Sequence, residues 1–519
     1  MPTDYVRALF RYVDSGSKAT AFELGDRELS WSQLEALSRR YAAGLQSLGL
    51  EKGDRVAVML ETSLELMVAL VGHYRLGLIH VPVNTGYGPV EISHILADSG
   101  ARAVLVDDDT PAHGLLDELD MPATLERRIV VGGERDDGEI GFGQLCEHDP
   151  IEGPPAVVDD DRSMFIYTSG TTGASKGVEH TYRSVLTDID NLTKLWQWSE
   201  ADRQVLALPL FHVHGLGIGV HGTLLRGCST QLLETFDARK VAHAIGEGGT
   251  IFMGVPTMHT RLVRAMEDDP ALADQLAEAR LFTSGSAALR VDIFERFKEL
   301  TGHAILERYG MSETMLTLSN PYDGERRPGT VGFAVPGCEV RVVDEDFQDL
   351  EPGAEDKHGQ IVVRGPTLMQ GYWNQPELTE EAFHDGWFLT GDVATVDEDG
   401  YIAIAGRESV DIIMSGGYKI SAREIEQVIQ QDPHVREIAI VGVPDPEWGE
   451  RIAAAVVPAE RTEDTIERDI LLARLAERVD ASLASYKKPR DLIIVDELPR
   501  NALGKIQKHR IIEDFRARQ

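Results

Sequence analysis

The stretch Tyr167–Gly177 carries glycines, hydroxyl side chains and one lysine directly after a short apolar run. Glycines let backbone N–H groups approach a ligand closely, hydroxyls add donors, and Lys176 adds a mobile positive charge. This set suits a polyphosphate. It is not a Walker loop, because that motif places Gly-Lys-Ser/Thr from the fifth position after its first glycine, and Ser175 stands five residues after Gly170. A flexible surface loop remains the alternative for this stretch taken alone.

The elements around this loop indicate an α/β fold. Met164–Tyr167 has the pattern of a strand, and the residues from about Thr181 to Trp198 have that of a helix. Strands and helices also alternate before it, which predicts a parallel sheet with helices packed on it. The expected elements there are a helix within Glu28–Leu50, strand Arg55–Leu60, helix Ser63–Tyr74, strand Ile79–Val83, helix Val90–Asp98 and strand Ala103–Val106. Further short strands are expected at Val205–Leu208, Gln231–Leu233, Thr250–Gly254 and Arg280–Thr283.

The pattern changes after about Thr330 to a β-rich one. Strands are expected at Glu339–Val343, Gln360–Arg364 and Tyr401–Ala405, followed by helix Ser421–Gln431, strand Glu437–Val443 and helix Ile466–Leu483. We place a domain boundary between Gly406 and Val410. The predicted domains are residues 1–408 and a small α+β domain of residues 409–519, a size at which a domain can fold by itself.

Composition limits the classes of protein. The chain has 519 residues, 42% of them hydrophobic and 26% charged, which is ordinary for a globular enzyme of two to four domains. With 51 basic and 86 acidic residues the net charge is -35, which argues against a nucleic-acid partner. An anionic ligand must therefore be held by local cations and backbone donors.

The cysteines and apolar runs favour a cytoplasmic protein. Cys146, Cys228 and Cys338 are widely spaced and odd in number, so they suggest neither a disulfide framework nor a zinc site. The N-terminus has no basic leader with an apolar core, so we expect no signal peptide. Residues Val56–Val83 are interrupted by charged and histidine side chains and are too polar for a membrane span. The oligomeric state is left open between monomer and homodimer.

Four further motifs follow the glycine-rich loop: Tyr309–Thr314, Leu389–Asp392, Gly406-Arg407 with Gly416–Lys419, and Pro499–Lys505. In this order the set resembles the adenylate-forming superfamily, which includes acyl-CoA synthetases, luciferases and adenylation domains. The resemblance implies a large N-terminal domain of stacked mixed sheets with packed helices and a β-rich subdomain, plus a small mobile C-terminal domain. It also implies a two-step reaction, in which a carboxylate and ATP give an acyl-adenylate and pyrophosphate, and coenzyme A then displaces AMP.

The resemblance assigns roles to particular residues. The catalytic set is Lys505, Glu313 and Lys176, with Glu313 as the Mg²⁺ ligand. The expected ATP- and AMP-binding residues are Thr168, Ser169, Gly170, Thr171, Thr172, Gly173, Lys176, Gly285, Ser286, Ala287, Glu307, Arg308, Tyr309, Gly310, Met311, Ser312, Asp392 and Arg407. The hinge is expected at Ser409 and Val410, and the coenzyme A tunnel at Gly416, Gly417 and Tyr418.

These residue types suit those roles. Tyr309 offers a flat face to adenine, Ser312 a hydroxyl to phosphate, and Asp392 an acceptor for both ribose hydroxyls. Because two anions meet in the first step, cations must stabilise the transition state. Lys505 is expected to enter the site for adenylation and to leave it when the C-terminal domain rotates.

Segments around Leu208–Leu216, Arg280–Ala287 and Ser319–Gly329 resemble the malonyl-CoA synthetases within this superfamily. A dicarboxylate needs a cation for its unreacting carboxylate, and Arg280 is our candidate because a guanidinium binds a carboxylate with two hydrogen bonds. Its alternative role is to stabilise a helix C-terminus. An Arg280→Met variant is therefore expected to lose malonate turnover far more than ATP binding. Ser284 and either His212 or His214 are expected beside the acid, and the choice between the two histidines stays open.

Three alternatives remain at this point. The substrate could be methylmalonate or another short or medium-chain acid. The acceptor could be a carrier protein instead of free coenzyme A. The chain could also be a nucleotide-binding regulator without catalysis, although Glu313, Asp392, Arg407 and Lys505 together speak against that reading.

Overall fold

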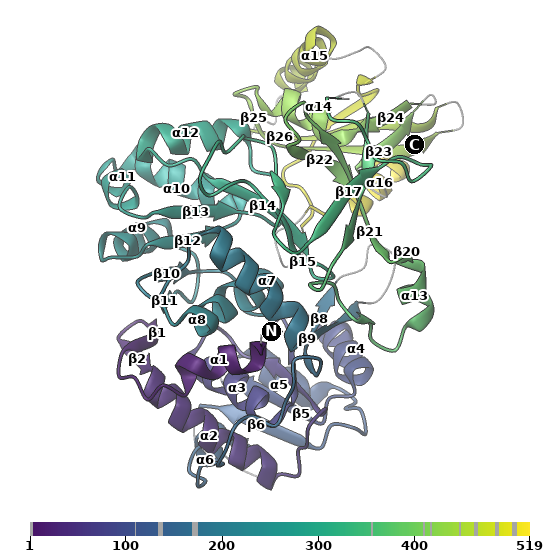
Figure 1. Ribbon diagram of the computed structural model, residues 1–519. Coiled ribbons are helices and arrows are strands. Elements are labelled where there is room, and N and C mark those ends of the chain that lie inside the picture. The colour runs from purple at the N-terminus through teal and green to yellow at the C-terminus, as the bar shows by residue number, and fades with distance from the viewer. Residues whose placement is uncertain are drawn as a thin grey trace. The chain divides into compact units, whose positions relative to one another are not determined.

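The chain forms two compact units in the computed structural model (Figure 1): Met1–Glu339 with Val363–Phe388, and Val340–Val362 with Leu389–Gln519. The structure describes residues 4–108, 110–132, 139–168, 175–353, 357–407, 411–415, 418–445, 448–460, 465–482, 487–500 and 506–518. The domain boundary that we predict from the sequence falls at residues 408–410, outside these ranges, and stays a prediction.

An eight-stranded sheet in the first unit has the order β19-β9-β8-β4-β3-β5-β6-β7. Its strands are β3 (Arg55–Met59), β4 (Ile79–Pro82), β5 (Ala103–Asp107), β6 (Arg127–Val131), β7 (Ile140–Gly141), β8 (Arg162–Thr168), β9 (Lys176–Thr181) and β19 (Gly371–Tyr372). The strands from β8 to β7 run parallel, whereas β9 is antiparallel to both β8 and β19. The central strands are continuous buried runs of Val, Ile and Ala, as parallel strands covered on both faces require.

A nine-stranded sheet, also in the first unit, has the order β16-β15-β14-β13-β12-β10-β11-β1-β2. Its strands are β1 (Thr20–Leu24), β2 (Arg27–Ser30), β10 (Arg203–Leu206), β11 (Ser229–Leu232), β12 (Ile251–Gly254), β13 (Leu281–Ser284), β14 (Leu306–Met311), β15 (Met315–Ser319) and β16 (Phe333–Ala334). The strands from β1 through β14 are parallel, and β15 returns antiparallel to β14.

Helices cover both sheets, and two of them lie between the sheets. Helix α3 (Leu64–Leu76), which is buried along almost its whole length, contacts β4 and β1. Helix α7 (Tyr182–Leu195) contacts β9 and β15 (Figure 1). The other helices of this unit are α1 (Tyr5–Val13), α2 (Trp31–Ser47), α4 (Pro89–Ser99), α5 (Pro111–Glu118), α6 (Phe142–Leu145), the π-helix η1 (Val213–Val220), α8 (His221–Arg226), α9 (Ala238–Gly246), α10 (Pro256–Asp268), α11 (Ala271–Leu276), α12 (Val291–Thr301) and α13 (Pro376–Glu381).

The division between the units falls within strands of a five-stranded sheet, with the order β17-β18-β21-β20 and β22 paired to β21. These strands are β17 (Glu339–Val343), β18 (Gly359–Arg364), β20 (Phe383–His384), β21 (Trp387–Val396) and β22 (Ile402–Arg407). The second unit also has a sheet of β24 (Tyr418–Ser421), β23 (Ile412–Ser415), β26 (Gly449–Pro458) and β25 (Val435–Asp445), with β27 (Asp491–Ile494) paired to β26. Its helices are α14 (Ala422–Gln430), α15 (Thr465–Ser482) and α16 (Lys508–Ala517).

Strand β22 is joined to the first turn of α14 within the second unit. The Ser421 hydroxyl donates to the carbonyl of Ala405 at 2.5 Å, and Arg423 Nη1 donates to the carbonyl of Ile404 at 2.6 Å. These bonds connect the residues before and after the predicted hinge.

The fold class expected from the sequence is confirmed. One element is wrong: Lys176–Thr181 forms strand β9, where the sequence led us to expect a loop running directly into a helix. The helix itself begins at Tyr182 and ends at Leu195. Among the described residues, the structure contains no helix with the length and apolar character needed to cross a bilayer.

Candidate active site

The glycine-rich stretch connects two antiparallel strands. Thr168, the last residue of β8, lies opposite Lys176, the first residue of β9. The base of this hairpin is fixed by α4: His94 Nε2 donates to the carbonyl of Ser175 at 2.7 Å, and the Tyr167 hydroxyl donates to Asp98 Oδ2 at 2.7 Å. Burial, and then the Asp98 carboxylate, raise the pKa of Tyr167. The hairpin tip lies outside the described residues, and with it the predicted phosphate-binding residues Ser169, Gly170, Thr171, Thr172 and Gly173.

A second hairpin, β14–β15, carries Ser312 and Glu313 on its turn, and both side chains are buried. His180 Nε2 donates to the carbonyl of Ser312 at 2.6 Å. Burial lowers the pKa of His180 to about 4, so this imidazole is neutral at pH 7. The Tyr372 hydroxyl donates to Glu313 Oε1 at 3.0 Å, and Lys176 Nζ lies 5.1 Å from the centroid of the Tyr372 ring. The structure thus brings the predicted catalytic residues Lys176 and Glu313 to the same tyrosine.

Strands β13 and β14 are parallel neighbours, and Ser284, the last residue of β13, is paired to Glu307, so that β14 continues past the carboxyl end of β13. Ligands of α/β sheets bind at such strand ends. The predicted nucleotide-binding residues of these strands and the turns after them are therefore neighbours; they are Gly285, Ser286, Ala287, Glu307, Arg308, Tyr309, Gly310, Met311 and Ser312. Glu307 has a structural contact here, because its Oε1 accepts from the backbone N–H of Gly329 at 2.7 Å.

The backbone of this region is strained. Ser286 and Met315 have φ angles of 68° and 58°, in the left-handed region that non-glycine residues rarely adopt. A Cβ on Gly310 would lie 1.9 Å from the carbonyl of Met315, and one on Gly285 would lie 2.4 Å from Arg308 Cζ. Strain and close backbone approach of this kind gather at functional sites.

Arg308 is a buried cation, with 5% of the residue exposed. Its Nε and Nη2 have no hydrogen-bond partner among the described residues. Burial lowers its pKa to about 10, so the guanidinium remains protonated at pH 7. A buried charge with unfilled donors is costly, and an anionic ligand would relieve that cost.

Two histidines next to η1 contribute to the same region. The backbone N–H of His214 donates to His212 Nδ1 at 3.2 Å, and Ser286 Oγ lies 3.4 Å from His214 Nδ1. Burial, and then the charge of Arg308, lower the pKa of both imidazoles, that of His212 to about 4. His214 Nε2 and Ser284 Oγ are buried without a partner in the described part of the chain. The result is a cluster of unfilled donors, namely Arg308, His214 and Ser284.

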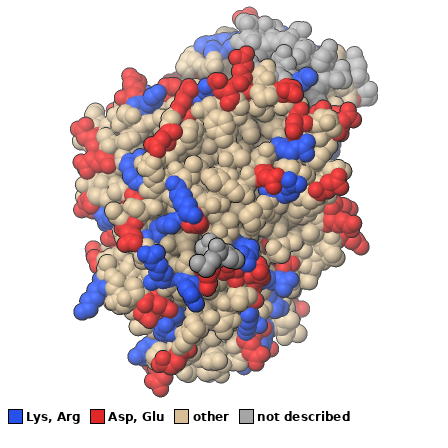
Figure 2. All heavy atoms as spheres, in the orientation of Figure 1, with Lys and Arg blue, Asp and Glu red and all other residues tan. Residues whose placement is uncertain are grey.

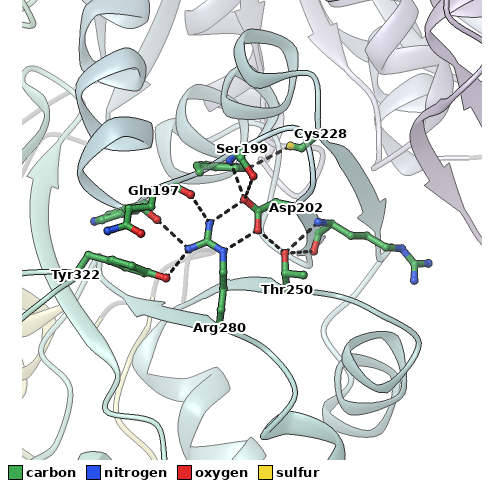
Figure 3. Close-up of polar contacts among 10 residues, drawn as sticks. Gln197, Ser199, Asp202, Cys228, Thr250, Arg280 and Tyr322 are labelled. Atoms are coloured by element: carbon green, nitrogen blue, oxygen red, sulfur yellow. Dashed lines mark hydrogen bonds and ion pairs between the residues drawn. The ribbon is translucent and has the colours of Figure 1, made fainter.

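Arg280, our candidate from the sequence for the acid-binding cation, is wrong for that role because its guanidinium is fully occupied (Figure 3). Nε and Nη2 donate to the two oxygens of Asp202 at 2.7 and 2.8 Å. Nη1 donates to the carbonyl of Trp196 at 2.9 Å and to the Tyr322 hydroxyl at 3.0 Å, and Nη2 also donates to the carbonyl of Gln197 at 3.1 Å. All five N–H groups of the guanidinium are thereby used, and none remains for a substrate.

The sequence did not predict Arg308 as the acid-binding cation, because its motif assigned it to nucleotide binding. The sequence carried no clear signal of its burial, because Leu306–Met311 also contains Glu307 and Gly310 and is not an apolar run.

The predicted ribose-binding pair lies in the second unit. Asp392 on β21 and Arg407 on β22 are direct partners in the antiparallel register, so both occupy the same position along the strands. The backbone N–H of Asp392 also donates to Thr390 Oγ1 at 3.0 Å.

Comparison with known proteins decides the family. Residues 9–373 match the model of the "AMP-binding enzyme" family, and residues 424–505 match its "AMP-binding enzyme C-terminal domain". The chain belongs to the AMP-binding enzymes.

Similar proteins agree with that family. A probable CoA ligase of Humulus lupulus, CCL8, is 36% identical over 492 residues, covering 90% of this chain and 80% of that protein. A malonate–CoA ligase of Arabidopsis thaliana is 34% identical over 484 residues, covering 89% and 78%. The crystal structure of ATP-bound MatB from Rhodopseudomonas palustris has a TM-score of 0.88 at 34% identity, with 99% of each chain covered. This AMP-binding enzyme is an ATP-dependent acyl-CoA ligase.

The described residues of this AMP-binding enzyme hold no group of three or more His, Cys, Asp or Glu side chains that could bind a metal by themselves. Mg²⁺ often takes only one or two carboxylates and completes its shell with phosphate oxygens and water. The buried carboxylate of Glu313, close to the Ser312 hydroxyl, fits such a partial site.

The structure does not test the site residues that we predict for the C-terminal domain. Lys505, the hinge residues Ser409 and Val410, and the coenzyme A residues Gly416 and Gly417 lie outside the described ranges. The backbone of Tyr418 begins strand β24.

Proposed function

We propose that this ligase forms malonyl-CoA from malonate, ATP and coenzyme A, with methylmalonate as a possible second substrate. The observation that carries the proposal is the buried Arg308 guanidinium, which has unfilled donors and lies one residue beyond the carboxyl end of β13 in the register of the sheet. A monocarboxylic acid would leave the Nε and Nη2 donors of Arg308 unfilled, whereas a short dicarboxylate supplies a second carboxylate for them. The similarity to malonate–CoA ligases supports the same substrate.

In this proposal Arg308 holds the unreacting carboxylate of malonate by two parallel hydrogen bonds. Ser286 donates to His214 Nδ1, which leaves the proton of the neutral imidazole on Nε2. His214 Nε2 and the Ser284 hydroxyl then donate to the acid as well. The other carboxylate of malonate stays unpaired and nucleophilic.

The nucleotide-binding residues predicted from the motifs keep their roles in this proposal. Lys176 and Ser312 bind phosphate oxygens, and Asp392 and Arg407 bind the ribose. Glu313 would hold Mg²⁺, which when bound neutralises charge on the phosphates. Lys505 adds a further cation during adenylation.

The reaction has two balanced steps. A carboxylate oxygen of malonate bonds to the α-phosphorus of ATP, and the bond to the β-phosphate oxygen breaks to release pyrophosphate. The thiolate of coenzyme A then attacks the acyl carbon, the acyl–phosphate ester bond breaks, and AMP leaves. The C-terminal domain rotates between the steps about Ser409 and Val410, removing Lys505 from the site.

An acid panel tests the substrate. Purified protein is given ATP, Mg²⁺ and coenzyme A with malonate, methylmalonate, succinate, acetate or a medium-chain fatty acid, and AMP and the thioester are measured by mass spectrometry. We expect the highest kcat/KM with malonate. Preference for a monocarboxylate would refute the malonate assignment, and transfer to a carrier protein alone would replace coenzyme A as the acceptor.

An Arg308→Met variant tests whether the Arg308 guanidinium binds the acid. Its kcat/KM for malonate should fall roughly a hundredfold, because truncating one partner of a buried charged pair costs about 3 kcal/mol. The ratio of acetate to malonate use should rise. The matched control is Arg290→Met, which removes a surface arginine paired with Asp292 and should leave the ratio unchanged. An unchanged ratio in Arg308→Met would remove Arg308 from acid recognition.

A further inference from the structure

Tyr372 lies between the two catalytic charges of the first unit. Its hydroxyl donates to Glu313 Oε1 at 3.0 Å, and its ring faces Lys176 Nζ at 5.1 Å from the ring centroid. A cation within about 6 Å of an aromatic face is attracted by the electrons of the ring. One side chain therefore interacts with a carboxylate at its polar tip and with an ammonium at its face.

The backbone around Tyr372 is fixed to the strands that carry both charges. Tyr372 pairs with Val178 on β9, the strand that begins with Lys176. The N–H of Met369 donates to the carbonyl of Glu313 at 2.8 Å, and the Thr379 hydroxyl accepts from the N–H of Tyr372 at 2.9 Å. The backbone of Tyr372 is thus fixed to β9 and to Thr379, and Met369, three residues earlier, is fixed to Glu313.

We infer that Tyr372 is a positioning residue that keeps Glu313 and Lys176 apart and oriented. An ammonium and a carboxylate that can reach each other form an ion pair, which would remove both from a ligand. The hydroxyl gives Glu313 a neutral partner, and the ring gives Lys176 a partner that does not neutralise it. The inference rests on the proposed function, because it takes both charges as the groups that meet the phosphates of ATP and their cation.

Two variants separate the two contacts. Tyr372→Phe removes the hydroxyl that donates to Glu313 and keeps the ring that faces Lys176. Tyr372→Leu removes both the hydroxyl and the aromatic ring. The binding of a non-hydrolysable ATP analogue is measured by calorimetry for each protein, once with excess Mg²⁺ and once with EDTA. The matched control is Tyr12→Phe, which deletes a hydroxyl that donates to a glutamate, Glu200, on another part of the same unit.

In Tyr372→Phe, the gain in affinity that Mg²⁺ gives should shrink about tenfold, the loss expected for one hydrogen bond to a charged group. Affinity in EDTA should stay at the wild-type value because the ring still faces Lys176. In Tyr372→Leu, affinity should fall in both conditions. The Tyr12→Phe control should match wild type throughout.

The inference is overturned if Tyr372→Phe keeps the full Mg²⁺ effect, or if both variants weaken binding equally with and without Mg²⁺. The second outcome would indicate a general packing role. The proposed function fails separately: wild-type protein that binds the analogue but releases no AMP with any acid refutes the ligase reaction and leaves the binding comparison valid.

Discussion

Arg280 and Arg308 lie at opposite ends of strand β13. Arg280 immediately precedes β13, at its amino end, and Arg308 on the neighbouring strand β14 follows Glu307, the partner of the last residue of β13. Binding sites of parallel sheets form at the carboxyl ends, while the amino ends are closed by structural contacts. This difference explains why one guanidinium has all its donors filled and the other does not.

Position along a strand was therefore more informative than residue type. The sequence predicts a strand beginning at Arg280, and that prediction already places Arg280 at the wrong end for a ligand. The roles of Lys176 and Glu313 came from a motif, and the structure brings them to one tyrosine. Tyr372 could not be predicted, because its contacts join strands far apart in the sequence and β19 is only two residues long.

For Arg280→Met we now expect loss of stability without a change in acid preference. Asp202 is 5% exposed and would keep a buried charge without its main partner, which costs about 3–5 kcal/mol. Urea unfolding measures this loss, and the acid panel measures preference. A variant with the wild-type urea midpoint that had lost only malonate turnover would restore the acid-binding role of Arg280.

At the level of elements, strand β9 joins the phosphate hairpin to helix α7. Thr181 ends the strand and caps the helix, with its Oγ1 accepting from the N–H of Ser184 at 3.1 Å. The Ser184 hydroxyl in turn lies 3.0 Å from Nδ1 of His180, whose other nitrogen holds Ser312. The sequence did not predict β9, because the glycines and hydroxyl side chains that lead into it are typical of a loop. Glu179 and His180 also interrupt its apolar pattern. Its burial against α7 and β19 overrides that weak local preference.

The Ser184→Ala variant should lower the free energy of unfolding by about 1–2 kcal/mol, because it removes the hydroxyl that accepts from the N–H of Thr181 in the capping box and leaves His180 Nδ1 without its partner. Chemical denaturation measures the change. Ser47→Ala, which removes a hydroxyl bonded only to the carbonyl of Gly44 within its own helix, serves as the control and should change stability by a few tenths of a kcal/mol. Equal effects of the two substitutions would contradict this account of the strand–helix junction.

Across the whole molecule, charge is distributed unevenly between surface and site. Basic and acidic side chains are interspersed on the face drawn in Figure 2. Arg102, for example, is paired with Asp54 and Glu126, and Arg183 with Asp160. The net charge of -35 repels anionic substrates at long range. Attraction must therefore come from local cations such as Arg308 and Lys176.

Buried histidines make the stability of the folded chain depend on pH. His221 donates from Nδ1 to the carbonyl of Leu216 and accepts at Nε2 from the Tyr74 hydroxyl, both at 2.8 Å. Burial lowers its pKa to about 4. The unfolded chain then binds the proton first as pH falls below about 6.5, so stability decreases from there toward pH 4.

For His221→Gln, whose amide can make both hydrogen bonds, we expect a shallower loss of stability on acidification. The difference from wild type should reach about 1.4 kcal/mol per pH unit between pH 6 and pH 4.5. Urea unfolding at several pH values measures it, with stability near wild type at pH 7.5. Parallel pH profiles for the two proteins would show that His221 does not carry a lowered pKa.

The hydrogen bonds from Ser421 and Arg423 to strand β22 predict how a C-terminally truncated chain would behave. A chain terminated after residue 408 would strip the carbonyls of Ile404 and Ala405 of these donors. Because β22 pairs only with β21 among the described strands, its other edge would be available to strands of other molecules. Expression of the large fragment by itself would then yield aggregates, and co-expression with residues 409–519 as a separate chain would be the route to soluble material.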